Sequence, residues 1–269
     1  MTFPAVPLLT PTLRKLERRA PLDDDDRRAF LDLPVRYQAV DPNIYLVREG
    51  DRPDRSCLLI SGFAIRHKMT ETGERQVLSF HVAGDFCDLE GALLNVADHN
   101  LQTLTHCELA FIPRSAVRDL ILSHPRIGMA MWIDTLIDSS IFREWVVNVG
   151  RRDGRARIAH LLCEFARRME VAGLADAAGY ELPLTQEQIA DATGLTAVHV
   201  NRVLKTLTSE GLIRRTRRVV SIPNWAGLRR VAGFNETYLH FDQVAGHPGV
   251  QPGFNSAPVM PLQGRNQSF

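Results

Sequence analysis

The chain has 269 residues, enough for about two domains, and its 45% hydrophobic fraction is ordinary for a globular protein. With a net charge of +1 and no apolar run of about 18 residues, it does not read as a membrane-spanning protein. The N-terminus lacks the order of a signal peptide, so we expect a cytoplasmic protein. The four cysteines lie far apart without a CxxC pair, which predicts reduced thiols, no metal site and no cofactor. A redox role for one thiol stays open, because it depends on local surroundings.

The first half of the chain is predicted to be a short helical lead-in followed by strands. Residues 1–33 form the lead-in, with a helix at 27–33 after an acidic run. Residues 34–122 alternate short apolar runs with turn signals, and strands about ten residues apart are typical of a barrel or a sandwich. The runs expected to be strands are Ile44–Val47, Cys57–Ile60, Val77–Phe80 and Leu109–Ile112.

Residues 123–150 are predicted to form one long helix with Pro125 near its start. Its apolar residues spread too far around the helix to meet a single surface, because one turn takes 3.6 residues. We therefore expect one side to pack on the strands and the other to meet a second copy of the chain. The alternative is a monomer whose helix is covered by its own strands. The residues expected at the dimer interface are Ile133, Leu136, Ile137, Ser140, Ile141 and Val147.

Residues 185–205 are predicted to form two short helices joined by a tight turn. Thr185 and Gln188 have the spacing of a capping box, and Gly194 suits a turn with positive φ. The second helix has an apolar back and a hydrogen-bonding front, and such a helix fits the major groove of DNA. The alternative is a helical hairpin packed within a core. The apolar back consists of Val200, Val203 and Leu204.

Residues 213–222 are predicted to form a β-hairpin with a basic tip, a wing beside the two helices. The segment 195–230 carries a charge of +7, whereas the whole chain carries only +1. Positive charge concentrated beside a groove-reading helix is typical of a surface that binds phosphates. A solvated charged turn is the alternative. The cations expected to contact phosphates, which fix position without reading sequence, are Lys205, Arg214, Arg215, Arg217 and Arg218.

The order of strands, long helix and winged helix resembles the Crp/Fnr family of bacterial transcription regulators. The resemblance covers roughly residues 30–228 and is carried by GDRPDRSCLLISGFAIR (50–66), AGDF (83–86) and LTQEQIADATGLTAVHVNRVLKTLTSEGLI (184–213). It implies an α+β fold with a cyclic-nucleotide-binding-like β-roll at 34–122, a dimerisation helix at 123–150 and a winged helix-turn-helix at 151–228. An extension follows at 229–269, expected to be disordered from about 246.

The resemblance also implies partners and a mode of control. The family binds roughly palindromic double-stranded DNA as a homodimer, works with RNA polymerase, and uses the β-roll to reposition the DNA-binding domains. An effector-independent DNA-binding protein, with the β-roll as a dimer scaffold only, is the alternative. An enzyme is not expected, because the sequence contains no GxxxxGK[ST], HExxH, GxSxG or GxGxxG motif.

The expected effector pocket departs from the cyclic-nucleotide-binding members of the family. Those members carry Gly-Glu and Arg-Ser pairs, whereas this chain has Asp88-Leu89 and His99-Asn100. A phosphate about 4 Å from a charged Asp88 would cost on the order of 4 kcal/mol at an effective dielectric near 20. A histidine, mostly neutral at pH 7, does not offset that charge. We therefore expect an effector other than cyclic AMP.

Two other sensing chemistries follow from the resemblance. The oxygen-sensing branch uses N-terminal cysteines to hold an iron–sulfur cluster, and no cysteine precedes Cys57 in this chain, which argues against that mechanism. Ligation of haem by a single histidine stays open, although a lone histidine more often has a structural role. The candidates are His67, His81 and His106.

The recognition helix departs from the family as well. Members present a Glu and an Arg four residues apart; here Val198 takes the place of the Glu and Arg202 that of the Arg. We expect Arg202 to contact a guanine, a pair that contributes ~1–3 kcal/mol of discrimination. Thr196 at the helix N-terminus is expected to bind a phosphate. The remaining candidates are Asn201 and His199 for a purine edge, and Val198 and Ala197 for a thymine methyl.

Overall fold

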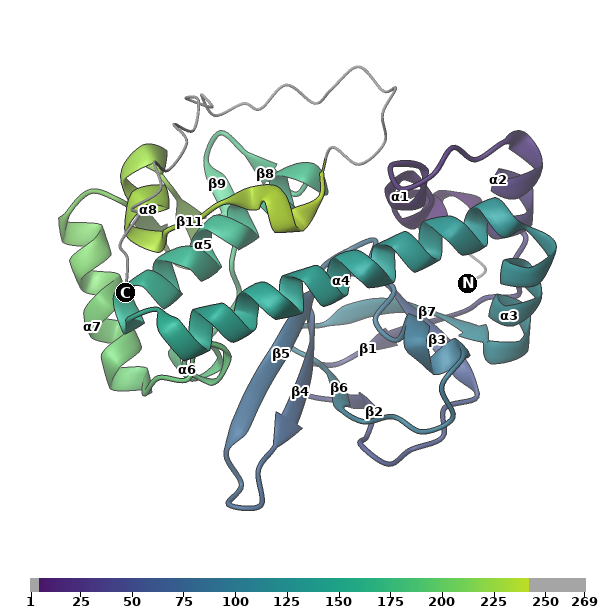
Figure 1. Ribbon diagram of the computed structural model, residues 1–269, viewed down its shortest axis with the longest axis horizontal. Helices are drawn as coiled ribbons and strands as arrows, with labels where there is room; N and C mark the ends of the chain where they lie inside the picture. The colour runs from purple at the N-terminus through teal and green to yellow at the C-terminus, as the bar shows by residue number, and fades with distance from the viewer. Residues whose placement is uncertain (1–4, 242–269) are drawn as a thin grey trace, which may run out of the picture.

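The computed structural model describes residues 5–241, so the extension expected to be disordered from about 246 lies outside the described residues. Helix α4 (Pro125–Arg151) crosses the molecule, with the strand-rich part beneath it and the C-terminal helices at its far end (Figure 1). None of the described helices is long and apolar enough to cross a membrane. The predicted α+β fold is confirmed.

The lead-in contains two helices, α1 (Ala5–Glu17) and α2 (Asp24–Leu31). The predicted helix at 27–33 corresponds to α2, which begins earlier because Asp23 and Asp26 form a capping box at its start. Helix α1 was not predicted, and it contains Pro11, a residue that disfavours a helix interior. Leu9 and Leu16 of α1 are buried in one cluster with Ile127 of α4, so tertiary packing stabilises this helix.

The β-roll consists of two antiparallel sheets. The four predicted strand runs lie wholly or largely within four of its seven strands, while the strands Arg36–Val40, Ala64–Met69 and Asn100–Thr103 were not predicted. Leu59, Leu101 and Leu109 are buried between the sheets together with Cys57, Cys87 and Cys107. One sheet has the order β1 (Arg36–Val40), β7 (Cys107–Pro113), β3 (Arg55–Ser61). The other has the order β2 (Tyr45–Val47), β6 (Asn100–Thr103), β4 (Ala64–Met69), β5 (Arg75–His81).

Helix α4 contacts both halves of the chain. It follows α3 (Arg114–Ser123), and Pro125 occupies the first helical turn, as predicted. Near its start, Ile127 and Met131 are buried beside the lead-in helices. Near its end, the ring of Trp145 lies 5.7 Å from that of Phe80 in β5, centroid to centroid, within the core of the C-terminal half. The long helix therefore connects the β-roll to the C-terminal domain.

The C-terminal domain packs around α5 (Gly154–Val171). Leu228 and Ala232 of α8 (Trp225–Ala232) are buried in the core that α5 shares, so the predicted end of this domain at residue 228 falls inside a helix. The other elements are β8 (Ala175–Asp176), β9 (Gly179–Glu181), α6 (Gln186–Thr193), α7 (Ala197–Ser209), β10 (Arg214–Thr216), β11 (Val219–Ser221) and the 3₁₀ helix η2 (Glu236–Leu239).

Polar contacts join the two halves away from α4. Arg75 of β5 forms an ion pair with Asp191 of α6, with 2.7 Å between Nη2 and Oδ2. The Gln76 side chain donates to the carbonyl of Ala192 at 3.4 Å. On the lead-in side, the Arg19 guanidinium donates to the carbonyl of His240 at 3.2 Å. The helix-turn-helix is thus docked directly on the β-roll in this structure.

Candidate DNA-binding surface and effector region

Helices α6 and α7 form the predicted helix-turn-helix, and local hydrogen bonds fix their ends. Thr185 Oγ1 accepts from the backbone N–H of Gln188 at 3.1 Å, and Gln188 Oε1 accepts from that of Thr185 at 2.9 Å. Gly194 has φ of 64°, which an L side chain adopts at a cost. Thr196 Oγ1 caps α7 by accepting from the His199 N–H at 3.2 Å. The predicted capping box and glycine turn are confirmed.

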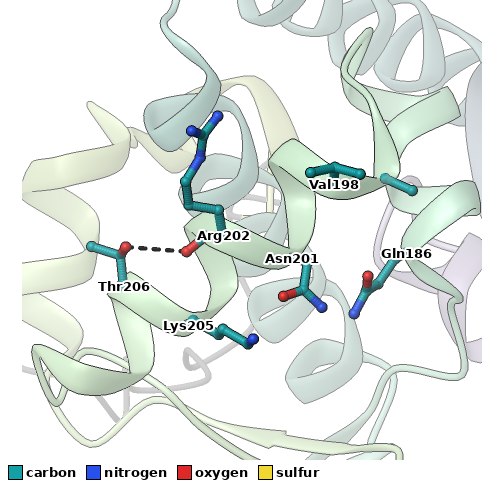
Figure 2. Close-up of a pocket in the computed structure, with 7 residues that line it drawn as sticks. Gln186, Val198, Asn201, Arg202, Lys205 and Thr206 are labelled. Atoms are coloured by element: carbon teal, nitrogen blue, oxygen red, sulfur yellow. Dashed lines mark hydrogen bonds between the residues drawn. The ribbon is translucent and has the colours of Figure 1, made fainter.

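Helix α7 buries one face and leaves the other open. Val200, Val203 and Leu204 are buried in the domain core, as predicted. On the open face the Val198 side chain is 79% exposed, and no apolar neighbour covers it. The open face borders a shallow hollow lined by Gln186, Ala197, Val198, Asn201, Arg202, Lys205 and Thr206 (Figure 2).

Two residues of this hollow were not predicted from the sequence. Gln186 comes from the first turn of α6, and its side chain faces Asn201 of α7 (Figure 2). Thr206 lies one turn beyond Arg202, and its hydroxyl donates to the Arg202 carbonyl at 3.1 Å. The position of Gln186 directly after an N-cap is a signal for the start of a helix. Its approach to the second helix depends on the angle between the two, which the sequence does not give.

Arg202 and His199 are in contact with each other. Nη2 of Arg202 donates to Nδ1 of His199 at 3.3 Å, and the Arg202 side chain extends away from Asn201 and Lys205 (Figure 2). The His199 ring lies against the start of α5: a Cβ added to Gly154 would be 2.5 Å from His199 Nε2. His199 therefore faces α5 and not the open front of the helix, which corrects its assignment as a base-reading residue.

The wing is the predicted hairpin. Strands β10 and β11 pair antiparallel with Arg214 opposite Ser221, and Arg217 and Arg218 form the turn between them. Arg217 has φ of 55°, a conformation that is uncommon outside glycine. Arg214, Arg217 and Arg218 are exposed, while Arg215 is half-buried. Three of the four wing arginines thus present their charge to solvent.

We expect the substitution Arg217→Ala to lower the affinity for every DNA sequence alike. A cation that contacts phosphate releases counterions, so its loss reduces the slope of log Kobs against log salt by about 1. The measurement is a titration of the operator and of unrelated duplex at several salt concentrations. A loss of affinity restricted to the operator would contradict this role.

The four residues expected to line the effector pocket are mostly engaged within the chain. Asp88 is buried, its Oδ1 accepts from the Cys57 N–H at 2.7 Å, and burial raises its pKa to about 7. His99 Nδ1 lies 2.7 Å from Asp98 Oδ1. Asn100 Oδ1 accepts from the Glu49 N–H at 3.2 Å. Leu89 begins the 3₁₀ helix η1 (Leu89–Ala92) and is half-buried.

The structure corrects the electrostatic argument made from the sequence. Asp88 was expected to carry a full negative charge, but a carboxyl with a pKa near 7 is partly protonated at neutral pH. A second carboxyl group at this place, that of Glu90, was not considered from the sequence. Glu90 forms an ion pair with Arg66 at 3.0 Å, and Arg66 pairs with Asp138 of α4 at 2.8 Å. An ion-pair cluster therefore connects the effector region to the long helix.

The histidines considered for haem lie in different surroundings. His67 is buried, and burial lowers its pKa to about 4. His81 is buried beside Ser79, whereas His106 is exposed beside Asp41. Within residues 5–241, no group of three or more His, Cys, Asp and Glu side chains is arranged to hold a metal ion. The four cysteines are free thiols, and all are buried.

Two family models match the chain. Residues 37–124 match the cyclic nucleotide-binding domain, and residues 156–231 match the Crp-like helix-turn-helix domain. The chain is 27% identical over 214 residues to the transcriptional activator protein FnrL of Cereibacter sphaeroides, covering 78% of this chain and 86% of FnrL. It is 26% identical over 176 residues to the nitrogen fixation regulation protein FixK of Azorhizobium caulinodans, covering 65% and 70% of the two chains.

Solved structures have the same fold. FixK2 from Bradyrhizobium japonicum superposes with a TM-score of 0.69 at 22% identity, over 74% of this chain and 98% of FixK2. The regulator CLP of Xanthomonas campestris, described as responsive to c-di-GMP, gives a TM-score of 0.60 at 21% identity, over 74% and 99%. In this chain a β-roll that matches the cyclic nucleotide-binding domain precedes a Crp-like helix-turn-helix, and the chain belongs to the Crp/Fnr family of transcription regulators.

Proposed function

We propose that this regulator binds a roughly palindromic operator as a homodimer, with α7 of each copy in the major groove. The observation that carries the proposal is the open front of α7, where Val198, Asn201 and Lys205 border a hollow that no other described element fills. The exposed wing arginines extend this surface with positive charge. Arg202, Asn201 and Val198 read base edges, while Lys205 and the wing contact phosphates.

The exposed face of α4 supports pairing with a second copy. Exposed residues recur along it at alternating spacings of three and four, the pattern of a coiled-coil seam. The Trp132 side chain is 62% exposed and that of Leu136 is 53% exposed, unusual values for large apolar residues of a long central helix. The seam consists of Met129, Trp132, Leu136, Ser139, Arg143 and Val146.

This seam changes the set of interface residues expected from the sequence. Ile137 and Ser140 are buried within the chain, and Ile141 packs against the core of the C-terminal domain. These three residues have little surface to offer a partner and are withdrawn from the interface. Leu136 lies on the exposed seam and Val147 beside it; both are retained, and Ile133, half-buried, lies at its edge.

Selection of bound duplexes from a random DNA library tests the proposal. The full chain is expected to enrich an inverted repeat whose half-sites lie about one helical turn, 10–10.5 bp, apart. That spacing is set by the distance between two symmetry-related recognition helices. Enrichment of single, unrepeated sites would contradict the homodimer, and no enrichment at low salt would contradict DNA reading altogether.

The effector is proposed to be a molecule other than cyclic AMP. A cyclic nucleotide phosphate bound beside η1 would have to displace Glu90 from Arg66, whose guanidinium also holds Asp138. We expect that millimolar cyclic AMP leaves the thermal midpoint of unfolding unchanged. A ligand that binds only the folded state at 100 times its Kd stabilises that state by about 2.7 kcal/mol, so an upward shift of the midpoint would contradict this proposal.

The second candidate function is effector-independent DNA binding. It is favoured by one observation: Asp88, His99 and Asn100 all have hydrogen-bond partners within the chain, so these side chains do not need a ligand to supply them. Library selection repeated with cell extract separates the two candidates, because only a controlled regulator changes its affinity. In either case we expect a cytoplasmic protein without enzymatic activity that acts together with RNA polymerase.

A further inference from the structure

We propose that His199 is a positioning residue that sets the direction of Arg202, and that the lack of a side chain at Gly154 makes room for its ring. This inference rests on the proposed function, because it concerns how Arg202 reads DNA. Two independent contacts support it: Arg202 Nη2 lies 3.3 Å from His199 Nδ1, and the opposite nitrogen of the same ring faces Gly154 of α5.

The chemistry of the two side chains fixes their roles. A guanidinium has only donors, so His199 Nδ1 is the acceptor in this contact. This bond occupies one N–H of Arg202 and holds the guanidinium plane. The remaining donors keep a fixed direction, and a bidentate contact to a base edge depends on that direction.

Gly154 provides the room for this arrangement. A Cβ at residue 154 would approach His199 Nε2 to 2.5 Å, and Cδ2 and Cε1 of the ring to 3.2 and 3.3 Å. The backbone of Gly154 is not in a positive-φ conformation. The backbone therefore does not require a glycine at residue 154. Because Gly154 has no side chain, it leaves the space that the ring of His199, 45 residues later in the chain, occupies.

The contact places α7 against the point where α4 passes into α5. Asp153 caps α5 by accepting from the Ala156 N–H at 2.9 Å, and the next residue is Gly154. At the other end of α7, Arg155 forms an ion pair with Glu210. Both ends of the recognition helix thus contact the first turn of α5. Of these two contacts, the one made by His199 also involves Arg202, the side chain that is expected to read bases.

The test compares single variants of the full chain on the selected operator and on operators with one base pair changed. His199→Ala is expected to lose about threefold to tenfold in discrimination at the base pair that Arg202 reads, the typical net contribution of one hydrogen bond. His199→Asn is expected to retain most of the discrimination, because asparagine Oδ1 lies close to the place of the histidine Nδ1 and accepts the same bond.

Gly154→Ala separates positioning from a structural role. It keeps both His199 and Arg202 and introduces a better helix former, so the domain stays folded. It is nevertheless expected to reduce discrimination at the same base pair, because the new methyl group displaces the ring. Gly150→Ala is the matched control: no atom lies within 4 Å of a Cβ added there, and its discrimination is expected to equal that of the unmodified chain.

The outcomes distinguish failure of this inference from failure of the proposed function. If Arg202→Ala loses discrimination while His199→Ala and Gly154→Ala do not, the positioning role is overturned and the proposed function stands. If His199→Ala weakens binding further in the presence of Arg202→Ala, His199 acts independently of Arg202 and the inference is also overturned. If Arg202→Ala discriminates like the unmodified chain, both the base-reading role of Arg202 and this inference are overturned.

Discussion

The substitution Arg202→Ala is expected to abolish selectivity for the operator while leaving weak, general binding to DNA. A bidentate contact between Arg and guanine contributes ~1–3 kcal/mol of discrimination, which corresponds to about 5-fold to 150-fold in relative affinity. A homodimer uses the contact twice, once in each half-site, so the combined loss is expected to exceed that range. The contacts to phosphate from Lys205 and the wing remain, and these contacts supply general binding.

Gel-shift titrations with the operator and with a scrambled duplex of equal length measure the ratio of the two affinities. Arg202→Ala is expected to bring this ratio close to one through a loss on the operator alone. Lys205→Ala is the matched control: it removes a cation one turn along the same exposed face and is expected to weaken binding to both duplexes similarly. Preserved selectivity in Arg202→Ala would show that the sequence is read elsewhere on α7.

The helix-turn-helix was predictable because its signals are local. The capping box of Thr185 and Gln188, and the positive φ of Gly194, each depend on residues within one turn of the helix. The wing was predictable for a similar reason, because its two short strands are joined by the two residues Arg217 and Arg218. Local rules of this kind do not require knowledge of the rest of the fold.

The elements that were missed depend on packing between distant segments. Helix α1 forms despite Pro11 because Leu9 and Leu16 are buried beside α4, more than 100 residues away in the sequence. Strand β6 has no exposed face, since every one of its residues is buried. Three of its four residues are polar, so it has neither the apolar run expected of a buried strand nor the regular alternation expected of a half-buried one.

The functional residues show the same division. The open front of α7 follows from helical periodicity, and sequence analysis placed Val198, Asn201 and Arg202 on it. The contact of His199 with Gly154 joins two helices that are separate in the sequence, so neither local sequence predicts it. The ion pair between Glu90 and Arg66 likewise joins η1 to β4. Periodicity also predicted that α4 is apolar on two sides, but it does not indicate which side the rest of the chain covers. Ile137 and Ser140 were assigned to the dimer interface, and the structure buries both within the chain.

The substitution Leu136→Glu is expected to convert the dimer into a monomer and to lower the affinity for the operator about 10²-fold to 10⁴-fold. Leu136 lies near the middle of the exposed α4 seam, where the proposed homodimer would bring the same residue of each copy close together about its two-fold axis. Two carboxylates would then meet in an apolar surface, where unpaired charges are strongly unfavourable. The predicted loss of affinity equals the contribution of linking two half-site contacts in one molecule.

Sedimentation equilibrium and operator titration, performed on the same preparation, measure the two effects of Leu136→Glu. The fold of the single chain is expected to persist, because the Leu136 side chain is already 53% exposed. Leu122→Glu is the matched control, since Leu122 is 76% exposed on α3, away from the seam, and this variant is expected to remain a dimer with unchanged affinity. A Leu136→Glu protein that still sediments as a dimer would place the interface on another surface. A monomeric one that keeps full operator affinity would instead show that one recognition helix is enough, and the palindromic operator would have to be abandoned.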